Sequence, residues 1–125
     1  MSDSYAVFPV TTEVRSWLES EGMMAPPKDG KPLLLQDLRQ LVSLVADVEA
    51  EWSNGPQFYD GAIRTCGGTT TTIIVGSPGN SSTPCEFHFQ GGDIELIKKV
   101  VCAIARFAGP QVIYAHSGSY TEVIQ

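Results

Sequence analysis

The sequence predicts an α+β fold in a single domain that spans residues 1–125. Short runs of alternating or β-branched residues, two of them joined by Gly67 and Gly68, predict strands that pair in antiparallel hairpins. Stripes of apolar residues at helical spacing predict about three helices. Strands and helices are partly segregated along the chain. We therefore expect a mostly antiparallel sheet of five to six strands with the helices packed on one face.

The stretch 85–116 specifies its own local structure most clearly. Its first six residues alternate between apolar and polar side chains, as in a strand with one buried face. Asp93 is a good N-cap for the long amphipathic helix that follows, and Gly109 with Pro110 ends that helix. The last six residues read as a return strand. The unit would be a right-handed βαβ crossover if its two strands are parallel.

The N-terminal part predicts one strand and one short helix. Residues 5–10 are apolar and extended in character, but Pro9 cannot donate a ladder hydrogen bond. We therefore expect an edge strand or a strand end there. Either Thr11 or Thr12 can cap a helix that continues to Gly22.

The middle of the chain predicts a second helix and a hairpin. Residues 23–32 form a loop by composition, and 33–52 carry apolar residues at helical spacing, which favours one long helix. Residues 57–66 and 69–76 are rich in β-branched residues and predict two paired strands. A last strand is expected at 120–125.

Composition and charge exclude several function classes. The chain has 125 residues, of which 42% are hydrophobic, and 14 acidic against 8 basic residues give a formal charge of −6. A nucleic-acid-binding surface needs clustered Lys and Arg, so we expect no nucleic-acid partner. No apolar run approaches the ~20 residues of a membrane span, and no export signal is visible. We therefore expect a cytoplasmic protein with reduced thiols and no membrane partner.

Three groups of residues resemble chemical sites but lack what the chemistry needs. Residues 91–93, GGD, lack the rest of a phosphate-binding motif, so we expect a turn and a helix cap. Cys85 and His88 point to opposite faces of a strand, and no C-x-x-C pair is present, which argues against zinc. Cys102 sits in the middle of a helix, without the activating neighbour that a nucleophile needs, and Cys66 beside Gly67 and Gly68 is the least implausible nucleophile. We expect Cys85 and Cys102 to be inert and buried, and we expect no catalytic residue, metal or cofactor.

One face of the predicted sheet is a candidate site. Glu86, His88 and Gln90 share one face of their strand. Tyr114 and His116 would join them if they project to the same side of the return strand. Such a mixture of aromatic and hydrogen-bonding groups is typical of protein interfaces. We treat these five residues as candidates for partner binding.

The same region resembles a known class of bacterial proteins. The sequences FHF at 87–89, GGD at 91–93 and AGP at 108–110, around a single core helix, are similar to small immunity proteins encoded beside polymorphic toxins, including those of contact-dependent growth inhibition. The resemblance implies a protein that binds a cognate toxin domain and blocks its active site. An acidic inhibitor would complement a basic, nuclease-type toxin.

The sequence thus leaves two functions open. The first is a non-enzymatic immunity protein whose partner is a cognate toxin. The alternative is a small-molecule-binding or enzymatic domain that uses His88, Tyr114 and His116, with the loop at 23–32 or 77–84 as a cover. An edge strand near either terminus could also support a homodimer.

Overall fold

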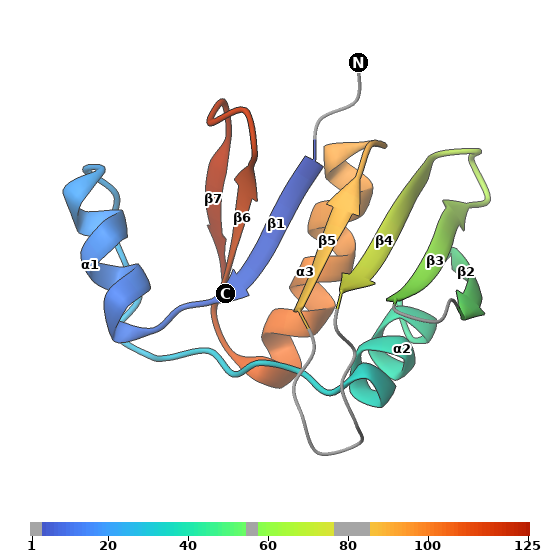
Figure 1. Ribbon diagram of the computed structural model, residues 1–125, viewed down its shortest axis with the longest axis horizontal. Helices are drawn as coiled ribbons and strands as arrows, with labels where there is room; N and C mark the ends of the chain where they lie inside the picture. Colours follow the sequence, from blue (N-terminus) through green and yellow to red (C-terminus); the bar gives the residue numbers. More distant parts are fainter. Residues whose placement is uncertain (1–3, 55–57, 77–85) are drawn as a thin grey trace.

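The protein folds as an α+β sandwich around one continuous sheet (Figure 1). A computed structural model describes residues 4–54, 58–76 and 86–125. The elements follow in the order β1 Ser4–Pro9, α1 Thr12–Ser20, α2 Leu35–Ser43, β2 Val48–Asn54, β3 Phe58–Thr65, β4 Thr70–Gly76, β5 Glu86–Gln90, α3 Ile94–Ala108, β6 Gln111–Ala115 and β7 Thr121–Ile124.

Seven strands form the sheet in the order β2-β3-β4-β5-β1-β6-β7, and every neighbouring pair is antiparallel. The predicted α+β class and mostly antiparallel sheet are therefore confirmed. The sheet has more strands than the five or six predicted, because one segment expected to be helical is a strand. The predicted β3–β4 hairpin is confirmed, with Thr65 and Thr70 at its closed end.

The single helix predicted for 33–52 is wrong. Helix α2 ends at Ser43, and Asp47 turns the chain with a positive φ of 61°. Strand β2 then pairs along its whole length with β3. Its apolar residues Val48, Ala50 and Trp52 pack on the core, and these positions have a period of two. In so short an apolar segment as 48–54, the spacing of the apolar residues fits either a helix or a strand. The strand is favoured because it pairs with the edge of β3.

Strand β1 lies in the middle of the sheet, between β5 and β6. The expectation of an edge strand is therefore wrong, but the alternative of a strand end is confirmed. Pro9 is the last residue of β1 and stands opposite Gln111. A proline at that position costs no interior ladder bond.

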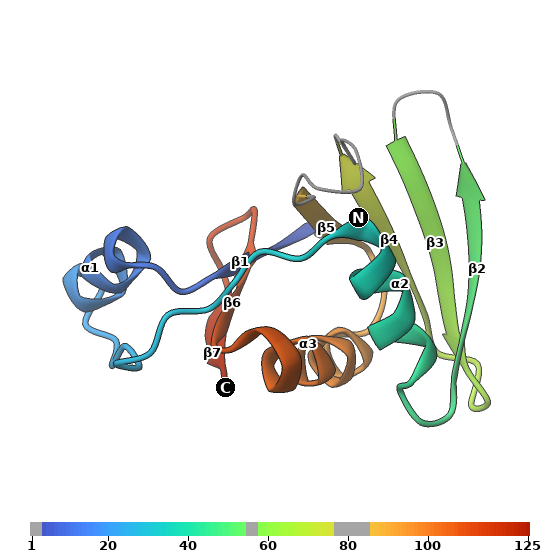
Figure 2. The ribbon, with the colours of Figure 1, turned by 90° about the horizontal axis from the view of Figure 1, so that it is seen from below.

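Helices α2 and α3 lie side by side on one face of the sheet, where the main core forms (Figure 2). The buried stripe of α3 includes Ile97, Val101 and Ile104, as its spacing predicts. We expected all helices on one face of the sheet, but α1 packs on the opposite face, beside β6. A separate cluster there joins Leu18 of α1 to Val112 of β6. No helix in the described ranges has the length and apolar character needed to cross a membrane.

The unit from β5 to β6 is a split crossover. Both strands are antiparallel to β1, which lies between them, so they run parallel to each other without pairing. The predicted turn and cap are confirmed. Gly91 and Gly92 have positive φ values of 68° and 92°, and the Asp93 carboxylate accepts a hydrogen bond from the Glu95 N–H at 2.7 Å. The Thr71 hydroxyl donates to the Gly91 carbonyl at 2.8 Å, which ties the turn to β4.

A segment that we call the strap, residues 23–34, connects α1 to α2 and is anchored to α1, to the residue after β1 and to α3. The Arg15 guanidinium donates to the carbonyls of Pro26 (2.9 Å) and Pro27 (3.2 Å) and to the carboxylate of Asp29 (2.6 Å). The Gly30 N–H donates to the Val10 carbonyl at 2.8 Å. These bonds hold α1 beside the end of the sheet.

Candidate functional site

All five candidate residues lie on the face of the sheet away from α3, which we call the open face. Phe89 is fully buried on the helical face, so the alternating residues Glu86, His88 and Gln90 point the other way. Strand β1 sits between β5 and β6, and its residue Ala6 stands opposite both His88 and Tyr114. Because Ala6 has only a methyl side chain, little separates the larger side chains on either side of it.

His116 extends the pairing of β1 and β6 by one residue, since its N–H donates to the Ser4 carbonyl at 2.9 Å. Its ring lies 6.3 Å from that of His88, centroid to centroid, with the planes at 74°. The pKa of His88 is lowered from its usual value of 6.5, first because the imidazole is partly buried and then because His116 adds repulsion. Protonation of His88 is therefore less favourable than protonation of a free imidazole.

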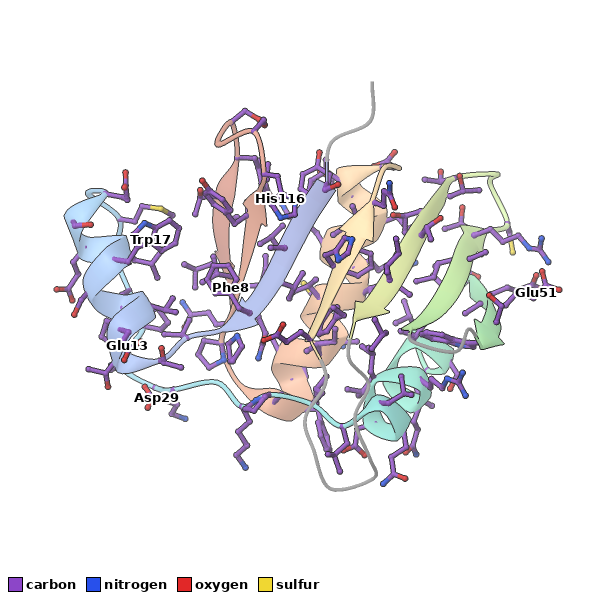
Figure 3. All side chains as sticks on the ribbon, in the orientation of Figure 1. Phe8, Glu13, Trp17, Asp29, Glu51 and His116 are labelled. Carbon is purple, nitrogen blue, oxygen red and sulfur yellow. The ribbon has the colours of Figure 1, made fainter. Side chains whose placement is uncertain are left out.

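Two aromatic residues that the sequence did not point to complete the site. Trp17 on α1 lies 5.6 Å from the ring of Tyr114 and 6.2 Å from that of Phe8. Figure 3 shows Trp17 on the side of α1 that faces the sheet, with Phe8 and His116 on the sheet itself. Two ring pairs, Trp17 with Tyr114 and His116 with His88, therefore lie on the open face between α1 and β5, and we call these four residues the aromatic row. All but the exposed His116 are half-buried.

The sequence feature that could have identified Trp17 as a site residue is the size of its side chain. Its helical spacing with Val14 and Leu18 predicts a core position, and both neighbours do face the small cluster on α1. However, Trp is rarely buried completely, because its ring is too large for the edge of a small core. A Trp on a short helix is therefore a candidate for a site that is half core and half surface.

The open face is acidic where charges are described. Glu86 on β5 and Glu49 and Glu51 on β2 are exposed there, with the guanidinium of Arg64 as the basic group. Arg64 contacts the Glu49 carboxylate at 3.4 Å, and both side chains are mostly exposed, so the pair adds little stability. Figure 3 places Glu51 at the far end of the sheet from Trp17.

The described residues contain no group of three or more His, Cys, Asp or Glu side chains that could hold a metal ion. Cys102 on α3 is half-buried, whereas Cys66 in the β3–β4 turn is exposed. Cys102 packs against the main core but is not fully buried, so the prediction of a buried cysteine holds there only in part. Cys85 lies outside the described residues.

Comparison with known proteins adds no relative: no family model, no curated protein and no solved structure matches the chain.

Proposed function

We propose that the protein is a non-enzymatic binding protein, and specifically an immunity protein that binds a cognate toxin domain and blocks its active site. The observation that carries the proposal is the aromatic row on an open sheet face. Trp and Tyr dominate the energetics of protein interfaces because they contribute large, rigid contact areas with one polar atom. Here Trp17 and Tyr114 contact each other and are only half-buried, so each keeps surface that a partner can cover.

Charge supports a basic partner. The open face carries the carboxylates of Glu49, Glu51 and Glu86, and the whole chain has a formal charge of −6. Complementary charge speeds association and excludes partners of the same sign. A nuclease domain has a basic substrate surface, because it must bind phosphates. We therefore propose a basic, nuclease-type toxin as the partner and the cytoplasm, where such a toxin would act, as the location.

The alternative of a small-molecule or enzymatic site on this face remains a prediction. It would require a ligand seated between His88 and Tyr114. The row itself favours the protein partner, because its aromatic rings extend from α1 across three strands and not around one point.

The test is co-expression of the protein with the toxin domain encoded beside its gene. We expect a stable complex on co-purification and rescue of growth. The double variant Glu86→Lys/Gln90→Lys should weaken the complex by about tenfold or more, because it places two positive charges against a basic partner. The control is Glu95→Lys on α3, which reverses an exposed charge on the other face and should leave binding unchanged.

Two results would count against the proposal. One is the absence of both complex and protection with the adjacent toxin domain. The other is an equal loss of binding in Glu95→Lys and in the open-face variant, which would mean that net charge matters and the open face does not.

A further inference from the structure

A cavity lies away from the open face, between the strap and the end of α3. Its volume is about 460 Å³, and its apolar wall includes Pro26, Pro27 and Pro110. The cations Lys28 and Arg106 also line it. This volume is within the ~300–1,000 Å³ range of small-molecule sites.

The walls of this basic cavity are held in place from several directions. Pro26 and Pro110 are buried, and the Pro26 carbonyl accepts the hydrogen bond from Arg15 at 2.9 Å. The Pro110 carbonyl accepts one from the Val10 N–H at 3.0 Å. Gly109 has a φ of 82°, and a Cβ at that position would lie 2.9 Å from the Asp29 carbonyl oxygen. The strap and the end of α3 are therefore closely fitted, and hydrogen bonds hold the walls of the cavity in place.

The charges at the cavity are unusual for this chain. Acidic residues outnumber basic ones by 14 to 8. Arg15, Arg64 and Lys98 each contact a carboxylate within 4 Å. Among the described residues, neither Lys28 nor Arg106 has such a carboxylate partner, and both are exposed.

The end of α3 also faces this region, and a helix C-terminus carries about half a negative charge. Two of its last carbonyls are already bonded: that of Ala105 accepts from the Gly109 N–H at 2.9 Å, and that of Ala108 from the Lys31 N–H at 2.6 Å. The charged side chains that line the cavity are those of Lys28 and Arg106, and Gln125 adds an uncharged polar side chain. The lining side chains therefore favour an anion.

We infer that this basic cavity binds a small organic anion with a flat apolar body, most simply a carboxylate. The proline rings would pack against the body of the ligand. The Arg106 guanidinium has the planar fork that matches a carboxylate, and Lys28 supplies a second charge. This site is separate from the aromatic row and does not depend on the proposed function.

The experiment is a titration of the labelled protein with benzoate, followed by amide NMR shifts. We expect saturable shifts at Lys28, Arg106 and Gly109. Benzamide, which has the same shape without the charge, and inorganic phosphate, which has charge without an apolar body, should each bind at least about fivefold more weakly. Benzoate should bind more tightly than benzamide because charge-assisted hydrogen bonds are roughly twice as strong as neutral ones.

Variants distinguish binding of benzoate in the cavity from nonspecific attraction to positive charge on the surface. Arg106→Gln should weaken benzoate binding by about fivefold or more, and Lys28→Gln should weaken it in the same direction. Lys99→Gln removes an equal charge from an exposed site elsewhere on α3 and should change nothing. Equal binding by Arg106→Gln and the unmodified protein, or shifts spread over the surface without saturation, would overturn the inference. The spectrum of each variant also reports whether it is folded.

Discussion

At the residue scale, His88 has the most informative environment. Its ring lies on the sheet between the cross-strand residues Ala6 and Ile74, and His116 is its aromatic neighbour. Burial is the larger cause of its lowered pKa, and repulsion from His116 is the smaller. A lowered pKa in the folded state means that the unfolded chain binds the proton more readily. His88 therefore contributes stability above pH 6.5, and this contribution is lost as the pH falls from 6.5 through the folded-state pKa.

This environment predicts how substitutions change the titration. His116→Gln should raise the pKa of His88 part of the way toward 6.5, because the repulsion is removed and the burial remains. An NMR titration of the imidazole Hε1 signals measures this directly. His88→Gln should reduce the loss of unfolding free energy between about pH 7.5 and 5.5, as followed by urea denaturation. An unchanged His88 pKa in His116→Gln would show that the two imidazoles do not interact.

At the element scale, the change from helix α2 to strand β2 depends on Asp47. A residue other than glycine with a positive φ costs about 1–2 kcal/mol, although Asp tolerates this conformation better than most. Asp47→Val should lower the unfolding free energy by roughly 1–2 kcal/mol, because a β-branched side chain fits this conformation poorly.

Glycine substitutions at Asp47 and at the neighbouring Ala46 test the same turn. Asp47→Gly removes the strain, whereas Ala46→Gly only adds backbone freedom to the unfolded chain. The unfolding free energies of these two variants should differ by at least about 1 kcal/mol in favour of Asp47→Gly. Urea denaturation measures both. Equal values would mean that the turn carries no strain at residue 47.

The turn before α3 is the second element-scale feature with a clear test. Gly92 and Gly22 both have positive φ, at 92° and 77°, but their surroundings differ. A Cβ on Gly92 would lie 2.6 Å from the Cβ of Thr71, whereas a Cβ on Gly22 would meet nothing within 4 Å. Both Ala variants are strained at the backbone, and only one forces the turn away from β4.

We therefore expect Gly22→Ala to cost about 1 kcal/mol of unfolding free energy, and Gly92→Ala to cost at least about 2 kcal/mol more. Chemical denaturation of the two variants in parallel provides the comparison. If the costs were equal, the turn would not be seated against β4 as described.

At the scale of the whole molecule, the sheet joins two apolar clusters on its opposite faces. Trp17 packs on the small cluster beside α1, and Trp52 packs on the main core at the other end of the sheet. Strands β1 and β6 contribute to both clusters, through Val7 and Ile113 on one side and Phe8 and Val112 on the other. We expect these shared strands to make unfolding a single cooperative transition.

Two substitutions allow the fluorescence of Trp17 and that of Trp52 to be followed separately. Trp17→Phe leaves Trp52 as the fluorescent residue, and Trp52→Phe leaves Trp17. In each variant, the urea midpoint from fluorescence should coincide with that from far-UV circular dichroism. A lower fluorescence midpoint for Trp17 would show that α1 and the strap detach before the sheet unfolds.

The sequence by itself determined the features that depend on neighbouring residues. The β3–β4 hairpin, the N-caps of α1 and α3, and the alternation of β5 follow from turn chemistry and side-chain spacing within a few residues. The same alternation places Glu86, His88 and Gln90 on one face. These predictions succeeded because the interactions that decide them are local.

Only the tertiary structure decided which segments lie together. It places β1 in the centre of the sheet, turns 48–54 into a strand, and brings Trp17 to Tyr114 across almost a hundred residues of chain. It also joins Lys28 of the strap to Arg106 of α3 around one cavity. A strand completes its hydrogen bonds with whatever partner the fold supplies, and a surface site collects side chains from distant segments. Neither the partner of a strand nor the composition of a surface site can be predicted from local spacing, because both depend on contacts between residues that are far apart in the chain.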